Sequence, residues 1–205
     1  MAVITISRLY GCRGAQFARK LADELNYLYF DKEIFFKVAE ISNVSVSELK
    51  ALEGLVGYKI DILNKFIDND FIKRIIGVSH KIPDPEQLVK YIEETIIEFA
   101  KMGKVVIVGR GSQCILKDFP NSYHIKIVAD FEDRVKNLMK RGTSREGAIS
   151  TIKRMDELRK SYIEKFYKVN WLDPSLYHLV INFSKVKEEK AINLIKELID
   201  FEKES

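Results

Sequence analysis

Cysteine is scarce in this chain, and long apolar runs are absent from it. The two cysteines among 205 residues, Cys12 and Cys114, do not form the close pairs that metal sites use, and so low a number favours a reducing compartment. No stretch approaches the roughly 18 consecutive apolar residues of a membrane span. The first apolar run begins at Ala2, which leaves no room for a signal peptide. We therefore expect a cytoplasmic protein without a membrane partner.

A surplus of one charge is also missing. Lys and Arg number 34 against 30 Asp and Glu, a net charge of +4, and the two signs are interspersed. No basic run with interleaved aromatic residues marks a nucleic-acid groove, so we expect no nucleic-acid partner. The mild positive charge suits an anionic small-molecule substrate, although a solvated lysine-rich surface explains it equally well. With 46% hydrophobic residues, the length fits a single domain with an inserted lobe.

Five short apolar runs predict five β-strands. Two of them, AVITI and VVIVG, are continuous rather than alternating, which is typical of strands buried on both faces of a parallel sheet. Helical patterns separate the runs, and this alternation favours an α/β layer fold. The predicted strands are residues 2–6, 27–30, 105–109, 123–128 and 178–183.

Helices are predicted from start signals and from apolar spacing. Ser45 and Glu48 have the spacing of a capping box, and Asp84 precedes Pro85 as a cap precedes the first helical position. The predicted helices begin at Gly14, at Ser45, at Pro85, at Asp130 or Phe131, and at Ser144 or Thr143. Residues 31–104 exceed what one crossover helix needs.

The length of that segment predicts an insertion between the second and third strands. We expect a helical lobe over about residues 33–100, either lid-like or substrate-binding, and a further lid-like helical region over about residues 143–170. The apolar stretch at 55–77 could supply a homodimer contact.

The stretch SRLYGCRGAQF, residues 7–17, joins the first strand to the first helix. Glycines here let the backbone approach phosphate oxygens, and the helix start supplies free N–H donors. The consensus phosphate loop continues with a lysine and Ser or Thr, whereas this chain has Gly14-Ala15-Gln16. A plain strand–turn–helix unit explains the stretch equally well. The candidate nucleotide-binding residues are Ser7, Arg8, Gly11, Cys12, Arg13, Gly14, Ala15 and Gln16.

Cys12 invites a second interpretation, because thiolate phosphatases also use a cysteine in an anion-binding loop at a helix start. Such loops have an arginine six positions after the cysteine, where this chain has Ala18, and Arg19 misses by one. We therefore interpret Cys12 as a small loop residue, whose pKa the helix end could lower.

Several stretches resemble motifs of one family. These are ITISRLYGCRGAQFARKLADEL at the start, FDKEIF at 30–35, VIVGRGSQCIL at 106–116 and the C-terminal KRMDELRKSYIEKFYKVNWLDPSLYHLVINFSKV. Together they resemble the bacterial cytidylate-kinase-like proteins, a branch of the P-loop nucleoside monophosphate kinases that lacks the lysine at the position of Gly14. The resemblance implies a P-loop NTPase-type three-layer fold, a five-stranded parallel sheet with flanking helices and a helical insertion. It also implies phosphoryl transfer from ATP, with Mg²⁺, to a nucleoside monophosphate such as CMP.

The resemblance assigns roles to residues beyond the loop. Arg110 ends the third strand between two glycines and is expected to face the monophosphate, with catalytic and substrate-binding roles. Asp31 and Arg134 are further substrate-binding candidates. The helix that follows Ser144 resembles one whose arginines close over the phosphates, which implies catalytic roles for Arg154, Asp156 and Arg159. A solvated ion pair would explain Asp156 and Arg159 as well.

The loop departs from the family pattern, with Cys12 for Ser, Arg13 for Gly and Ala15 for Arg. We hypothesise that Arg13 replaces the absent lysine. The magnesium ligand stays unassigned among Ser7, Gln16 and Asp130. Two alternatives stay open: a nucleotide-binding protein without phosphoryl transfer, and a kinase for another small molecule.

Overall fold

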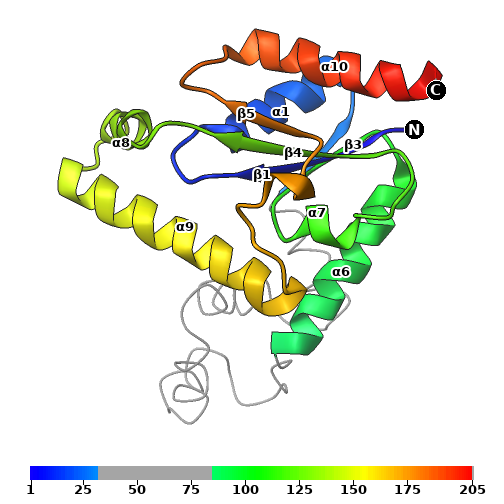
Figure 1. Cartoon of the computed structure of the whole chain (residues 1–205), viewed down its shortest axis with the longest axis horizontal. Coiled ribbons are helices and arrows are strands. Elements are labelled where there is room, and N and C mark those ends of the chain that lie inside the picture. Colours follow the sequence, from blue (N-terminus) through cyan, green and yellow to red (C-terminus); the bar gives the residue numbers. More distant parts are fainter. Residues whose placement is uncertain (32–84, 205) are drawn as a thin grey trace.

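The computed structural model describes residues 1–31 and 85–204 of the chain (Figure 1). The helix predicted from Ser45, the larger part of the predicted lobe and the apolar stretch at 55–77 lie outside the described residues.

Five parallel strands form one sheet in the order β2-β3-β1-β4-β5. They are β1 Val3–Arg8, β2 Leu28–Phe30, β3 Val105–Val108, β4 Ser122–Val128 and β5 Leu179–Asn182. β1 is central and pairs with β3 as far as Ile6↔Val108 and with β4 as far as Arg8↔Ile127. The predicted five-stranded parallel sheet is confirmed. The carboxyl end of β1 lies between two strand ends, where open α/β sheets bind ligands.

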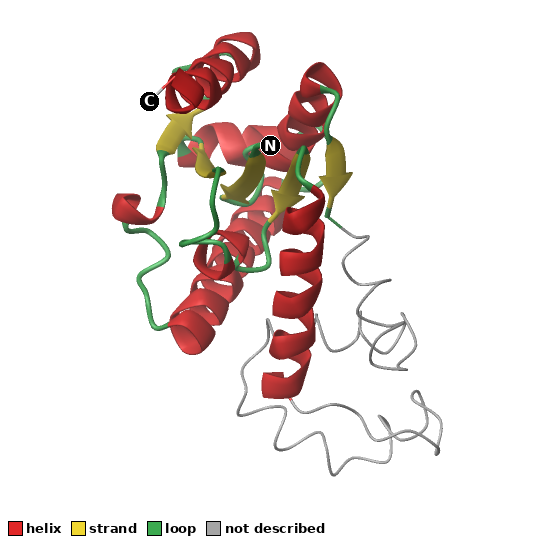
Figure 2. Cartoon of the chain, turned by 90° about the vertical axis from the view of Figure 1, so that its right-hand side faces the viewer, coloured by secondary structure: helices red, strands yellow, loops and turns green. Residues whose placement is uncertain are grey.

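Helices cover both faces of the sheet, as Figures 1 and 2 show. α1 Gly14–Leu25 and α10 Glu188–Glu204 lie on one face, and α6 Pro85–Met102 and the short α7 Ser112–Ile115 lie on the other. Ile4 and Ile6 of β1 pack with Phe17 of α1, whereas Val3 packs with Ile96 of α6. The three layers therefore meet at β1, which positions the loop that follows it.

The part of the predicted lobe that is described is α6, and it packs on the sheet through Ile92, Ile96 and Ala100. Neither α7 nor α10 was predicted from the sequence. For α10 a signal exists, because Ala191, Ile192, Ile195 and Ile199 have helical spacing and are all buried.

Two helices lie at the carboxyl edge of the sheet. α8 Phe131–Met139 follows β4, and α9 Arg145–Tyr167 runs from α8 back toward α6 (Figure 1). Ser144 caps α9 by accepting a hydrogen bond from the N–H of Gly147, so this helix begins where the sequence predicts. Val135 and Leu138 of α8 pack with Ile152 of α9, which fixes the two helices against each other beside the loop.

Candidate functional site

The loop between β1 and α1 has the backbone form of an anion cradle. Gly11 and Arg13 adopt left-handed conformations, with φ of 81° and 64°. α1 begins at Gly14, and the side chain of its N-cap residue Arg13 makes no capping hydrogen bond. The first N–H groups of a helix have no partner within the helix, and they carry partial positive charge. The geometry therefore supports the predicted phosphate-binding role of Gly11, Gly14, Ala15 and Gln16 through their backbone.

α8 supports this loop from behind. Asn137 donates a 2.9 Å hydrogen bond from its amide to the carbonyl of Gly11. A Cβ on Gly11 would lie 2.8 Å from Cδ1 of Leu138 and 3.1 Å from the carbonyl oxygen of Arg134, and the φ of 81° adds strain for any other residue, so glycine is favoured here. The hydrogen bond from Asn137 thus directs the carbonyl oxygen of Gly11 toward α8 and away from a ligand in the loop.

Asp156 and Arg134 hold the loop from the side. Asp156 accepts a 2.7 Å hydrogen bond from the N–H of Tyr10, and its other oxygen pairs with Arg134. Arg134 also donates to the carbonyl of Tyr10, at 3.2 Å. The structure thus brings two predicted site residues together, but as a clamp on the loop backbone. Arg134 is 8% exposed, so the pair is largely shielded from solvent.

Three arginines gather at the ends of β1 and β3. Arg159 of α9 donates a 2.8 Å hydrogen bond to the carbonyl of Arg8. Burial lowers the pKa of Arg159 to about 9, and the charge of Arg8 acts in the same direction, whereas Asp156 opposes it. Burial likewise lowers the pKa of Arg8, with Asp31 opposing and Arg110 adding to the effect. The cluster is therefore a concentration of positive charge next to the loop.

Arg110 lies in a strained turn after β3. Its φ is 60°, between Gly109 and Gly111 with φ of 75° and 74°. A left-handed conformation is costly for a residue that has a Cβ, and such positions cluster at functional sites. The ring of Tyr167 from α9 covers Gly111, where a Cβ would lie 2.4 Å from Cε2. Arg110 thus lies at the carboxyl end of β3, directly after Val108 and Gly109.

Asp31 lies at the end of β2 on the same edge. Its carboxylate is 3.7 Å from the guanidinium of Arg8 and accepts a hydrogen bond from the hydroxyl of Tyr29. The predicted acceptor-side residues Asp31 and Arg110 therefore flank Arg8 on the β2–β3 side of the loop.

Several predicted loop side chains turn away from the cradle. The Arg13 guanidinium pairs with Glu188 of α10 at 3.2 Å, on the α10 side of the sheet. The hydroxyl of Ser7 is buried, and it accepts a hydrogen bond from Nε1 of Trp171 at 2.9 Å. This bond ties Trp171 to the end of β1. Arg154, the remaining catalytic candidate, is exposed on α9.

Cys12 differs most from its sequence interpretation. Its side chain is 1% exposed and points at the carbonyl of Ile127. Burial is the main reason that the pKa of its thiol is raised, and this outweighs the N–H of Gly14 and the nearby arginines. The expectation of a lowered pKa is therefore wrong, because burial outweighs the helix end, and only the backbone of Cys12 remains a candidate for phosphate binding.

The three candidate magnesium ligands are engaged elsewhere. Gln16 accepts a hydrogen bond from Arg141, Asp130 accepts one from Asn182 and pairs with Lys185, and Ser7 is bonded to Trp171. Within residues 1–31 and 85–204, no group of three His, Cys, Asp or Glu side chains could hold a metal ion. A magnesium ion at this edge would thus take its ligands mainly from phosphate oxygens and water.

A buried lysine next to the site was not among the predicted site residues. Lys126 of β4 is 3% exposed and stands opposite Ser7 in the sheet register. It donates to the carbonyl of Trp171 and the hydroxyl of Tyr177, and its ammonium lies over both rings. Burial lowers the pKa of Lys126 to about 8. The signal was a lysine inside the apolar run YHIKIV.

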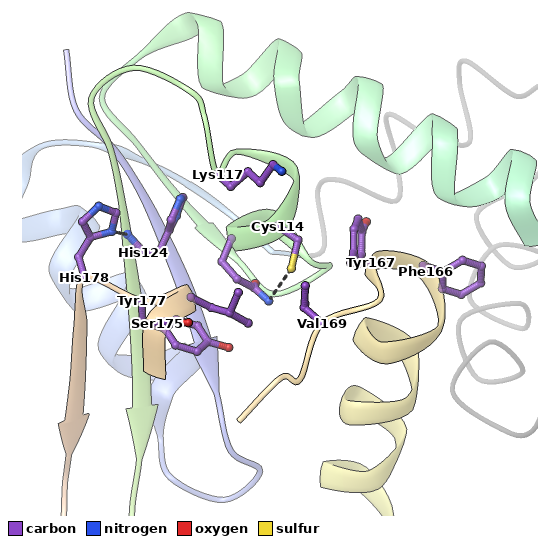
Figure 3. A pocket seen from close by; sticks show the side chains of 11 residues that line it. Cys114, Lys117, His124, Phe166, Tyr167, Val169, Ser175, Tyr177 and His178 are labelled. Atoms are coloured by element: carbon purple, nitrogen blue, oxygen red, sulfur yellow. Dashed lines mark hydrogen bonds between the residues drawn. The ribbon is translucent and has the colours of Figure 1, made fainter. Parts of the chain in front are cut away.

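A cavity of about 650 Å³ lies on the α7 side of the sheet (Figure 3). None of its lining residues was a candidate site residue. The ring of His124 is hydrogen-bonded to Thr5 and Ser122, and burial lowers its pKa to about 4. The lining includes Cys114, Lys117, His124, Tyr167, Tyr177 and His178. The cavity is thus separate from the phosphate loop.

The comparisons with known proteins agree with this architecture. A model of the cytidylate kinase-like family matches residues 3–185. An uncharacterized protein from Eubacterium ventriosum ATCC 27560 is 24% identical, with a TM-score of 0.70 over 98% of this chain and 99% of that one. A shikimate kinase from Bacteroides thetaiotaomicron is 12% identical, with a TM-score of 0.54 over 97% of this chain and 98% of the kinase. Likeness at these identities shows the fold, that of the P-loop kinases. No curated protein matches the chain.

No helix in the described ranges has the length and apolar character that crossing a membrane requires.

Proposed function

The chain belongs to the cytidylate kinase-like family, and from this premise we propose that it transfers a phosphoryl group from ATP to a nucleoside monophosphate such as CMP. The observation that carries the proposal is the gathering of Arg8, Arg110 and Arg159 beside the uncapped start of α1. Phosphoryl transfer needs positioning and charge stabilisation more than covalent chemistry. Arg8 repels both Arg110 and Arg159, and a phosphate group that lies among the three offsets this repulsion.

The roles divide between the two sides of the loop. The backbone N–H groups from Gly11 to Gln16 bind the donor phosphates, and Arg159 approaches them from α9. Arg110 binds the phosphate of the acceptor at the end of β3, where Asp31 contacts the acceptor nucleoside. When bound, ATP supplies the phosphoryl group and Mg²⁺ neutralises part of the phosphate charge.

Asp156 and Arg134 are positioning residues in this scheme. They fix both backbone polar groups of Tyr10, so the cradle is held in shape before a ligand arrives. A preformed cradle spares the ordering cost at the moment of binding. Arg154 contacts the transferring group only if the region around α9 closes further, which excludes water as a competing acceptor.

The second candidate is a nucleotide-binding protein that performs no transfer. The observation that favours it is the engagement of Ser7, Gln16 and Asp130 with other residues, which leaves magnesium without an assigned protein ligand. The two candidates share the binding step and differ only in turnover.

We further propose small-molecule nucleotides as the partners and the cytoplasm as the location.

The test is a coupled assay of ADP release with ATP, Mg²⁺ and each nucleoside monophosphate in turn. CMP-dependent release that the Arg110→Ala variant abolishes supports the kinase, because a contaminating kinase would persist in that preparation. Measurable ATP binding without release for any monophosphate supports the second candidate or a different acceptor. Absence of both binding and release rejects both candidates.

A further inference from the structure

The loop exchanges a glycine and a cation relative to the consensus. In GxxxxGK[ST] the first glycine precedes the lysine by six positions. Gly14 stands at the lysine position, and the residue six positions before it is Arg8. The chain thus has cations at both glycine positions of the consensus, Arg8 and Arg13, and glycine where the consensus has the lysine.

The structure explains why the two changes occur together. A Cβ on Gly14 would lie 2.7 Å from Cβ of Arg8 and 3.2 Å from its Cγ. Real Cβ atoms essentially never come within 3.0 Å of such an atom, and the neighbour is the stem of the side chain rather than its flexible tip. Gly14 is not among the glycines with positive φ. This glycine is therefore required by the space that Arg8 occupies, not by its own backbone conformation.

A second glycine makes room for the other end of the same side chain. A Cβ on Gly109 would lie 2.1 Å from Nη1 of Arg8. The side chain of Arg8 thus crosses from the start of α1 to the end of β3. Its guanidinium is 3.7 Å from Asp31, beyond hydrogen-bond distance, and among the described residues it donates no hydrogen bond. The N–H groups of the guanidinium are therefore available to hydrogen-bond a ligand.

We propose that Arg8 takes the place of the phosphate-loop lysine, binding phosphate oxygens from the β3 side while Gly14 leaves it room. This assignment replaces the hypothesis for Arg13, whose guanidinium pairs with Glu188. The steric exchange between positions 8 and 14 stands by itself. The identity of the phosphate compound rests on the proposed function.

The steric part is tested without any ligand. Thermal unfolding is measured for the wild type, Arg8→Gly, Gly14→Lys and the double variant Arg8→Gly/Gly14→Lys. Gly14→Lys is expected to lower the Tm by roughly 5 °C when Arg8 is present, and by much less when residue 8 is glycine. If Gly14→Lys does not fold, Gly14→Ala is the milder probe of the same overlap. An equal fall in Tm in both backgrounds overturns the exchange.

The charge part is tested by calorimetric titration with inorganic tripolyphosphate. Arg8→Gly is expected to weaken binding roughly 10-fold or more, and the double variant to recover most of that loss. Arg145→Gln removes an exposed arginine that pairs with Glu132 and is the charge-matched control. Unchanged affinity in Arg8→Gly, or no binding to the wild type, overturns the assignment. A wild type that binds tripolyphosphate but releases no ADP with any nucleoside monophosphate refutes the proposed nucleoside monophosphate kinase and leaves the exchange intact.

Discussion

Asp156 accepts a 2.7 Å hydrogen bond from the backbone N–H of Tyr10, although 146 positions separate the two residues. The contact joins the middle of α9 to the loop that follows β1. The same carboxylate pairs with Arg134 of α8, which donates to the carbonyl of Tyr10. The loop is thereby held by two helices that come after it in the chain, and its shape depends on their packing.

Removing this carboxylate should therefore cost stability as well as function. Asp156→Ala leaves Arg134 buried without its partner and the N–H of Tyr10 without its acceptor. We expect the free energy of unfolding to fall by about 3 kcal/mol, measured by urea denaturation. Glu132→Gln, which breaks an exposed ion pair with Arg145, is the control and should change it by less than about 1 kcal/mol. Equal losses in the two variants would show that the Asp156–Arg134 pair stabilises the protein no more than the exposed Glu132–Arg145 pair does.

Lys126 predicts a pH dependence of stability. Burial lowers its pKa from the ordinary value of 10.5 to about 8 in the folded protein, so between these values the unfolded chain binds more protons. Stability that is lost to the buried charge below pH 8 is therefore regained as the pH rises toward 10.5. Replacing the ammonium in Lys126→Met should stabilise the protein near pH 7 by up to about 3 kcal/mol.

The difference in free energy of unfolding between Lys126→Met and the wild type isolates the titration of Lys126 from that of other groups. The advantage of Lys126→Met should shrink steadily above pH 8 in urea denaturation series. Tyr177 still donates to the carbonyl of Trp171 at 2.9 Å, so the variant leaves that oxygen satisfied. A difference that stays constant from about pH 7 to pH 10.5 would contradict the lowered pKa.

The sheet and the helices α1, α6, α8 and α9 could be predicted because apolar spacing and capping signals are local properties of the sequence. Continuous runs such as AVITI and VVIVG indicate buried parallel strands, and Ser144 marks the start of α9. The order of the strands and the docking of α9 on the loop depend on contacts between distant residues. No local pattern contains these contacts.

The roles of Arg8 and Arg13 show where sequence reasoning ends. Both are cations within one loop, and Arg13 stands nearer to the missing lysine. Arg8 is the last residue of β1, and its side chain lies toward β3, whereas Arg13 adopts the left-handed conformation before α1 and pairs with Glu188. Because α10 was not predicted, this partner of Arg13 could not be foreseen.

Gly111 predicts a measurable cost of overlap with Tyr167. Gly111→Ala places a Cβ 2.4 Å from the ring at a residue whose φ is 74°. Gly142→Ala is a matched control, since Gly142 has a φ of 89° and nothing within 4 Å of the added atom. Both variants carry the conformational strain, and only the first carries the clash. We expect Gly111→Ala to lose roughly 2 kcal/mol more than Gly142→Ala by urea denaturation, and equal losses would exclude the close packing.

Cys12 provides the sharpest check on the chemistry of the loop. A thiolate nucleophile needs an exposed sulfur with a lowered pKa, whereas this thiol is 1% exposed and its pKa is raised. We expect iodoacetamide at about pH 8 to leave Cys12 unmodified in the native protein, as followed by mass spectrometry of its peptide. Cys114 is partly exposed with a pKa raised to about 11, so it should react slowly but before Cys12. In urea both should react at similar rates, because unfolding removes the burial that separates them. Rapid native labelling of Cys12 would instead mean that the loop opens its sulfur to solvent, and the thiolate-phosphatase interpretation would regain support.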